Sequence, residues 1–403
     1  MLATRTIALA ALAAIALPAA AQLRPQYRFP EVARDSSGPA AVQLGTAPVY
    51  ATPTATLGYG HDSNVTNAQT GRLDSPFATY GADVVLDAQS TRSVYLGELY
   101  GTHNSYSDSS QDDFTDWGTR NAYDIAFTTR NFLHLNLDYV QGHEGRGTTD
   151  RPDQGSPDIY RLGKAGGLYA YGAPGAQGRV EVYGNYFERR YQNNRDTSQF
   201  SDRNTEEYGG VFYWRAMPKT YALVELRGTH NHYLNEGTHL SGTESRYFVG
   251  ATWEATAATS GTIKVGEYEK SFDSDRPTVR DPAWEVAIDW SPRSYSNFSF
   301  YTIRTPVEST GVGDFIRTDT TGVVWNHQWS SVWNTTVGLG YQHSRYQGAD
   351  RVDDTALADL KATYKFRRWL SFSGEYLYSN RDSNQPNLDY RRNIWLLTAI
   401  FSL

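Results

Sequence analysis

The chain has 403 residues, a formal net charge of −7 and no cysteine, and hydrophobic residues make up 39% of it. The lack of cysteine excludes disulfides and a lipid-modified N-terminal cysteine, and the mildly acidic balance without a basic stripe excludes the usual nucleic-acid binders. No stretch reaches the roughly 20 apolar residues that a membrane-spanning helix needs, so no transmembrane helix is predicted.

The first 21 residues are predicted to be a secretory signal peptide. Arg5 supplies a positive charge, residues 7–17 form a short apolar core, and the alanines at 19–21 give a cleavage site. Residues 22–48 contain scattered proline, alanine and charged residues, with neither the periodicity of a strand nor that of a helix. We therefore expect them to form a largely irregular periplasmic lead-in to the rest of the chain.

From about Val49 onward the chain alternates apolar and polar residues with a period of two. Leucines and a tyrosine alternate with His, Asn and Asp over residues 132–139, and Trp, Val and Ile alternate with Glu, Ala and Asp over residues 284–290. Residues 356–366 and 370–378 repeat the pattern. A helix cannot present this pattern as one apolar stripe, so these segments are predicted to be β-strands.

The connections between the predicted strands alternate between short turns and long polar loops, such as residues 62–75 and 144–158. This alternation is typical of outer-membrane barrels. We predict an all-β fold over residues 49–403, a closed antiparallel transmembrane β-barrel of about 18 strands, with 16 as the alternative and both termini in the periplasm. The strands are expected to begin near residues 50, 77, 93, 117, 132, 160, 179, 205, 220, 244, 261, 282, 296, 316, 332, 354, 369 and 390. Pro53 cannot donate to a ladder, which allows the first strand to begin after it.

The last strand is predicted to close the barrel. Its backbone groups cannot stay unpaired in lipid, so it must pair with the first strand. Alternate residues of the closing strand are expected to face lipid, among them Trp395, Leu397, Phe401 and Leu403.

Charged residues on the polar faces of the strands are candidates for the lining of the lumen, because a charge facing lipid is costly. They either line a hydrated pathway or pair with one another and brace the wall. The candidates are Asp83, Asp87, Glu98, Asp138, Glu181, Glu225, Arg227, Glu285, Asp289, Asp359, Lys361 and Glu375. Most aromatic residues fit girdles at the membrane interfaces, while Tyr183, Phe187 and Tyr301 have the parity to point inward.

The sequence offers no catalytic constellation. It has no G-x-S-x-G elbow and no Ser, His and Asp set whose register brings the three together. His230 and His232 share a strand face, but a third metal ligand is not evident. We therefore expect no enzymatic activity, no cofactor and no metal site.

Several stretches resemble the Putative beta-barrel porin 2 family of bacterial outer-membrane proteins. They are LGYGHDSNVTN at 57–67, ERRYQNN at 188–194, GATWEATAATSGTIKVGEYEKSF at 250–272, WEVAIDWSPRS at 284–294 and RRWLSFSGEYLYSNRDSN at 367–384. Two positions depart from the pattern: Glu267 separates Gly266 from Tyr268, and the chain ends in Leu403, where outer-membrane proteins more often end in Phe.

The resemblance implies a barrel of the Gram-negative outer membrane that is often encoded beside exopolysaccharide genes. The expected function is a conduit, or an accessory of one, for exopolysaccharide export. The alternatives are a general or sugar-selective diffusion porin, and a structural barrel whose loops bind a partner. The expected partners are outer-membrane lipid and lipopolysaccharide, the β-barrel assembly machinery, and a polysaccharide with its periplasmic export components; nucleic acid is not expected.

Overall fold

A computed structural model describes residues 26–30, 41–256 and 258–402 of the chain. The predicted signal peptide and Leu403 lie outside the described residues. None of the helices in the described part is both long and apolar enough to cross a membrane.

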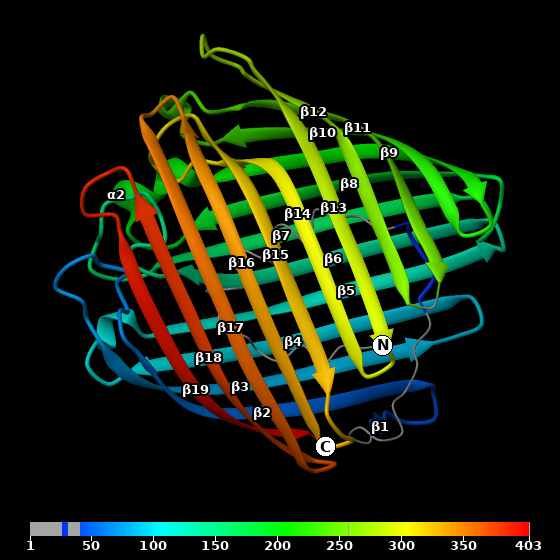
Figure 1. The fold of residues 1–403 in the computed structure, drawn as a ribbon, viewed down its shortest axis with the longest axis horizontal. Coiled ribbons are helices and arrows are strands. Elements are labelled where there is room, and N and C mark those ends of the chain that lie inside the picture. Colours follow the sequence, from blue (N-terminus) through cyan, green and yellow to red (C-terminus); the bar gives the residue numbers. More distant parts are fainter. Residues whose placement is uncertain (1–25, 31–40, 257, 403) are drawn as a thin grey trace.

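Eighteen antiparallel strands close into a barrel (Figure 1). Each strand from β2 to β19 pairs with its neighbours in sequence, and β19 returns to pair with β2, from Ile394 opposite Asp62 to Ser402 opposite Thr54. The predicted fold class and the count of 18, rather than 16, are confirmed. Closure gives the first and last strands a partner on both sides, as lipid requires.

The barrel strands are β2 (Val49–Asp62), β3 (Ser75–Gln89), β4 (Ser93–Tyr106), β5 (Phe114–Thr128), β6 (Asn131–Glu144), β7 (Asp158–Tyr171), β8 (Gly178–Tyr191), β9 (Arg203–Met217), β10 (Thr220–Tyr233), β11 (Gly242–Thr256), β12 (Thr259–Phe272), β13 (Val279–Arg293), β14 (Ser296–Glu308), β15 (Phe315–Gln328), β16 (Trp333–Gln347), β17 (Arg351–Arg367), β18 (Leu370–Ser383) and β19 (Tyr390–Ser402). The loops contain the short helix α2 (Arg195–Ser198) and the 3-10 turns η1 (Ser110–Asp112), η2 (Gln199–Ser201) and η3 (Glu236–Thr238).

The first barrel strand begins at Val49 and runs through Pro53, rather than after it. The pairing with β19 reaches back only to Thr54, and the two-residue strand β1 (Val42–Gln43) pairs with Tyr50 and Ala51. Pro53 therefore falls between the two ladders on that edge, where its missing N–H costs no hydrogen bond. The pairing of β1 also means that part of the predicted irregular lead-in is ordered.

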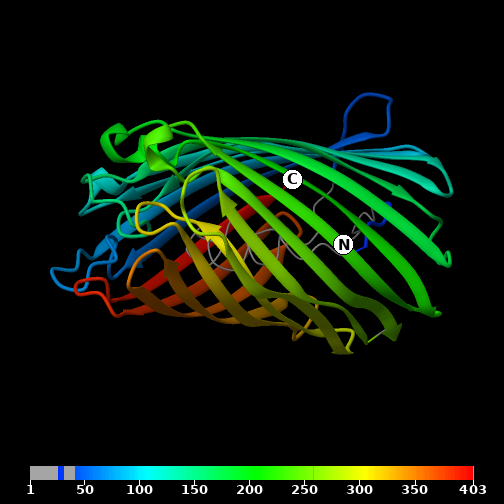
Figure 2. The ribbon, with the colours of Figure 1, turned by 90° about the horizontal axis from the view of Figure 1, so that it is seen from above.

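The connections divide the barrel into two unlike ends. Figure 2 shows the long loops gathered at one end and most of the short turns at the other. The longest connection is residues 145–157, between β6 and β7. We call these the loop end and the turn end; the periplasmic position of the termini stays a prediction.

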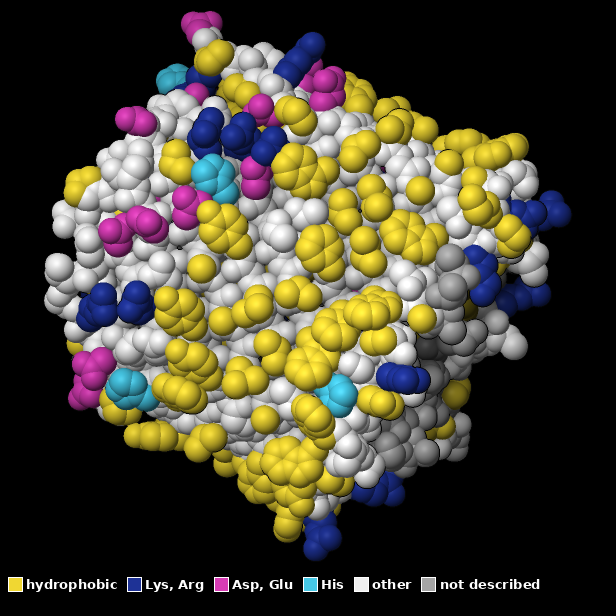
Figure 3. Space-filling view, viewed as in Figure 1, with side chains coloured by type: hydrophobic (Ala, Val, Ile, Leu, Met, Phe, Trp, Pro, Cys, Tyr) yellow, Lys and Arg dark blue, Asp and Glu magenta, His cyan; other side chains and the backbone are white. Residues whose placement is uncertain are grey.

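The outer surface is apolar where the strands cross the membrane. Figure 3 shows a broad band of hydrophobic side chains, with charged side chains gathered mainly beyond its edges. On β19, Trp395 and Leu397 are 60% and 70% exposed, while the alternate residues Ile394 and Leu396 are buried inside the barrel. This is the register expected for the closing strand, and Phe401, two residues beyond Ala399, continues the outward face.

Leu397→Arg should destabilise the barrel by ~2–4 kcal/mol, because the arginine would face lipid near the middle of the closing strand. Asn334→Arg is the matched control. Asn334 alternates with the outward Trp333 on β16 and therefore faces the interior, where a charge meets polar side chains. Heat-modifiable migration and urea titration of both variants measure the difference. Equal stability of the two variants would contradict the assigned register.

Candidate functional site

The predicted lumen residues all lie on the strand faces opposite the lipid-facing residues, but they do different things there. Four side chains on neighbouring strands of one wall form a closed ring of ion pairs, and the ring includes Lys264, which the sequence reasoning did not single out. Arg227 lies 2.6 Å from Glu225 and 2.8 Å from Glu285, and Lys264 lies 2.8 and 2.6 Å from the same two carboxylates. All four side chains are buried. This ring fits the bracing interpretation, because its charges are satisfied by one another.

A second buried pair lies on β17 and β18. Lys361 donates to Glu375 at 3.0 Å, and Asp359 is close by on the same face. One carboxylate oxygen of Asp359 and one of Glu375 have no hydrogen-bond partner in the described part of the chain. Here the acidic groups outnumber the cation, so the pair is less complete than the ring.

The remaining predicted residues are spread around the inner wall, and Asp289 lies on β13, the same strand as Glu285. Glu98 and Asp138 lie in one row with basic residues, Glu181 lies toward the turn end, and Asp289 is exposed and accepts a hydrogen bond from Ser299 at 2.5 Å. Asp83 is half-buried and Asp87 is buried on β3. These residues share a face, but the structure does not gather them into one site.

Several inward basic residues were missed by the sequence reasoning, although their parity could have identified them. Besides Lys264, they include Arg120, Lys164, Arg179, Arg246 and Lys270. The predicted lumen residues were mostly acidic. With these basic residues included, the inner wall carries both positive and negative charges.

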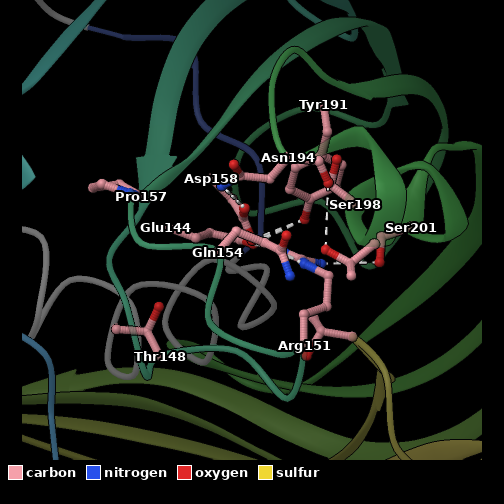
Figure 4. Close-up of polar contacts among 12 residues, drawn as sticks. Glu144, Thr148, Arg151, Gln154, Pro157, Asp158, Tyr191, Asn194, Ser198 and Ser201 are labelled. Carbon is pink, nitrogen blue, oxygen red and sulfur yellow. Dashed lines mark hydrogen bonds and ion pairs between the residues drawn. The ribbon is translucent and has the colours of Figure 1, made fainter. Parts of the chain in front are cut away.

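The loop of residues 145–157, which we call the crossing loop, folds into the mouth of the barrel. Figure 4 shows Arg151 reaching from this loop toward Glu144, Asp158 and Ser201. Its guanidinium lies 2.5 Å from Glu144 and 2.7 Å from Asp158, and it donates to Ser201 at 3.0 Å. The guanidinium also lies 4.5 Å from the centre of the Tyr191 ring. These contacts fasten the loop to the wall formed by β6, β7 and β8.

The residue before Arg151 binds the opposite wall. Asp150 accepts hydrogen bonds from Tyr346 of β16 at 3.0 Å and from Arg351 of β17 at 2.7 Å, and its backbone N–H donates to Thr310 at 3.1 Å. Strands β7 and β16 are nine strands apart whichever way the wall is followed. The crossing loop therefore spans the mouth from one side to the other.

A third contact holds the start of the crossing loop. Arg146 makes two hydrogen bonds to Asp112 of η1, at 2.8 and 2.5 Å, and its carbonyl accepts from Asn67 in the β2–β3 loop. The hydrogen bonds to Asp112 raise the pKa of Arg146 above its usual value, so the guanidinium keeps its charge at any physiological pH. The loop is thus tied to three parts of the rim, which fixes its path across the opening.

Residues 26–30 lie inside the barrel toward the turn end. Tyr27 donates its hydroxyl to Asp124 at 2.8 Å and its backbone N–H to Glu181 at 3.0 Å, and its carbonyl accepts from Arg179 at 2.6 Å. Burial, and then the bond to Asp124, raise the pKa of Tyr27, so its hydroxyl stays protonated and donates. The next residue, Arg28, forms an ion pair with Glu254 of β11. Residues 26–30 therefore occupy part of the lumen.

Residues 40–401 match the family model described as Putative beta-barrel porin 2. No curated protein sequence matches the chain. Among solved structures, Pseudomonas aeruginosa OccK2 (OpdF) in complex with glucuronate matches at 11% identity and a TM-score of 0.49, over 88% of this chain and 98% of that one. Pseudomonas aeruginosa OccK3 (OpdO) matches at 13% identity and 0.48, over 88% and 96%. The copper transporter OprC matches at 10% identity and a TM-score of 0.46, over 90% of this chain and 82% of that one.

Combining Asp150→Asn with Arg151→Met should release the crossing loop, because removing one partner of a buried ion pair costs ~3–5 kcal/mol. Single-channel recordings in planar bilayers should then show a larger or flickering current. Asp153→Asn is the control, since that exposed carboxylate lies 3.5 Å from Arg146 and binds neither wall. A double variant with the current of the unaltered protein would show that the loop does not limit the opening.

Tyr27→Ala should raise the single-channel conductance, because it removes the hydroxyl donor to Asp124 and the ring that packs 6.2 Å from Phe132. Tyr27→Phe keeps the ring and the backbone contacts, so we expect a smaller rise. Conductance in planar bilayers checks both variants. If Tyr27→Ala conducts like the unaltered protein, the lead-in does not obstruct the lumen.

Proposed function

Because the chain belongs to the Putative beta-barrel porin 2 family, we propose that it resides in the outer membrane and acts as a porin-like channel for small polar solutes. The observation that carries this proposal is the crossing loop, which divides the mouth of an 18-stranded barrel by binding both walls through Asp150 and Arg151. A barrel of this size otherwise leaves a wide aqueous channel. The loop reduces that opening to narrower passages beside it.

The same observation weighs against the exopolysaccharide conduit expected from the resemblance. An extended polymer needs one wide path through the whole barrel, and here the crossing loop stands at one end and residues 26–30 toward the other. The proposed function requires only that small solutes pass beside both obstacles. A purely structural barrel is supported by the buried ion pairs of the wall, among them the ring around Glu225 and Glu285 and the pair of Lys361 with Glu375, but the water-exposed charges of Glu98, Arg120 and Lys164 do not fit a purely bracing role.

The middle of the barrel offers polar solutes many weak contacts. Charged side chains such as Glu98, Arg120 and Lys164 lie there and remain partly exposed to water. A passage lined by weak hydrogen-bonding groups lets a solute enter and leave without tight binding. This chemistry suits diffusion of small hydrophilic molecules.

Liposome swelling with neutral sugars of increasing size tests the proposal. We expect mono- and disaccharides to enter quickly and long dextrans to be excluded, because the crossing loop narrows the mouth. Replacing residues 148–155 by a short Gly-Ser linker should raise the size limit, since the linker cannot reach the opposite wall. Passage of long polysaccharide through the unaltered protein would favour export, and no swelling with any sugar would favour a structural barrel.

A further inference from the structure

We propose that a row of alternating charges on β4 to β7, continued by Phe187 on β8, is a solute-binding site for small zwitterions. The row consists of Glu98, Arg120, Asp138 and Lys164. This inference rests on the proposed channel function and names the class of solute that the channel would favour.

The row is set by strand register. Glu98 is directly opposite Arg120, Arg120 is opposite Asp138, Asp138 is opposite Lys164, and Lys164 is opposite Phe187. Directly opposed residues on antiparallel strands point to the same face, and neighbouring strands lie ~4.8 Å apart. The interior therefore presents negative, positive, negative and positive charges in sequence, one strand spacing apart.

The row is open to water, unlike the buried ring on the other wall. The side chains of Glu98 and Arg120 are 25% and 44% exposed, and those of Asp138 and Lys164 are 24% and 31% exposed. In the ring around Glu225, by contrast, every charge is buried against another. A solute in the lumen can thus reach the row and cannot reach the ring.

The ion pairs within the row leave capacity for a ligand. Arg120 donates to Glu98 at 2.8 Å, while Lys164 lies 3.9 Å from Asp138, beyond ordinary hydrogen-bond length. The lysine ammonium has three donors, and Asp138 accepts from the backbone of Asn121 at 3.3 Å. A solute carboxylate can bind Lys164 and a solute ammonium can bind Asp138 without breaking the stronger pair.

Aromatic faces hold the two cations in place. The Arg120 guanidinium lies 4.4 Å from the centre of the Tyr100 ring, and the Lys164 ammonium lies 5.6 Å from the centre of the Phe187 ring. Cation–π contact of this kind limits how far the side chains swing. The positive positions of the row are therefore kept near their strands.

The row also lies on the route between the two obstructions. On the same wall, the crossing loop binds Glu144 of β6 and Asp158 of β7 nearer the loop end, and Tyr27 binds Asp124 of β5 nearer the turn end. Arg120 and Asp138 lie between these contacts along their strands. A solute that passes the crossing loop would meet the row before it reaches residues 26–30.

Alternation of sign selects the class of solute. A singly charged solute is attracted by a charge of opposite sign in the row and repelled by each like charge beside it. In a zwitterion whose ammonium and carboxylate are about one strand spacing apart, the ammonium is attracted by an acidic residue of the row while the carboxylate is attracted by the basic residue beside it. An ω-amino acid such as 4-aminobutanoate has this arrangement, whereas butanoate and butylammonium have the same size and one charge.

Single-channel recording in planar bilayers tests the proposal with these three probes. Added to the unaltered protein, 4-aminobutanoate should interrupt the current at concentrations where the two singly charged probes do not. Replacing Arg120 and Lys164 by Gln should weaken the effect of 4-aminobutanoate at least about tenfold, or ~1.4 kcal/mol, and make butylammonium the effective probe. Replacing Glu98 by Gln and Asp138 by Asn should instead make butanoate effective.

The control variant replaces Arg130 and Lys219, which lie in short turns, by Gln; it changes the net charge by the same amount outside the row. It should keep the preference for 4-aminobutanoate, and heat-modifiable migration reports whether each variant is folded. If the channel conducts but the ranking of the probes is the same in all variants, the row does not bind solutes and the channel function stands. If the unaltered protein does not conduct, the channel function itself is wrong, and the inference falls with it.

Discussion

The structure depends on one constraint: inside a membrane every backbone N–H and C=O must find a partner within the protein. The pairing of β19 with β2, from Ile394 to Ser402, satisfies this constraint at the last open edge. Closure then separates the lipid outside the barrel from the interior. Trp395 and Leu397 face lipid on one side of the strand, while Ile394 and Leu396 are buried on the other.

Closure also decides what the inward charges can do. The buried ring of Glu225, Arg227, Lys264 and Glu285 contains two acids and two bases within hydrogen-bond distance of one another. Such a ring stiffens its wall, because no member can leave without stranding another charge. The partly exposed row from Glu98 to Lys164 keeps its charges in contact with water. One barrel therefore contains a braced wall and a wall available to solutes.

The two obstructions are built from segments that are not part of the barrel ladder. The crossing loop holds the mouth through adjacent residues with opposite charge, Asp150 and Arg151, which bind opposite walls. Tyr27 holds the lead-in by its backbone and its hydroxyl, bound to Glu181 and Asp124. Because neither segment shares its hydrogen bonds with the ladder, either can be altered without opening the barrel. This independence lets the width of the passage be set separately from the stability of the fold.

The sequence by itself predicted the strands, a count of about 18 with 16 as the alternative, and the face of each strand residue. Period-two alternation fixes which side chains point inward, and the uncharged stretch from Ile394 to the end of the sequence indicates a closing strand, so the barrel and the outward Leu397 were predictable. The tertiary structure alone decided which inward charges meet. Parity gives the face of Lys264 but not its height on the wall, and only the register between strands brings it to Glu225 and Glu285. The paths of the crossing loop and of Tyr27 were also decided by the tertiary structure. These segments have no period-two pattern, so their sequence does not predict where their side chains point. Their binding partners, such as Tyr346 and Asp124, also lie on strands far away in sequence.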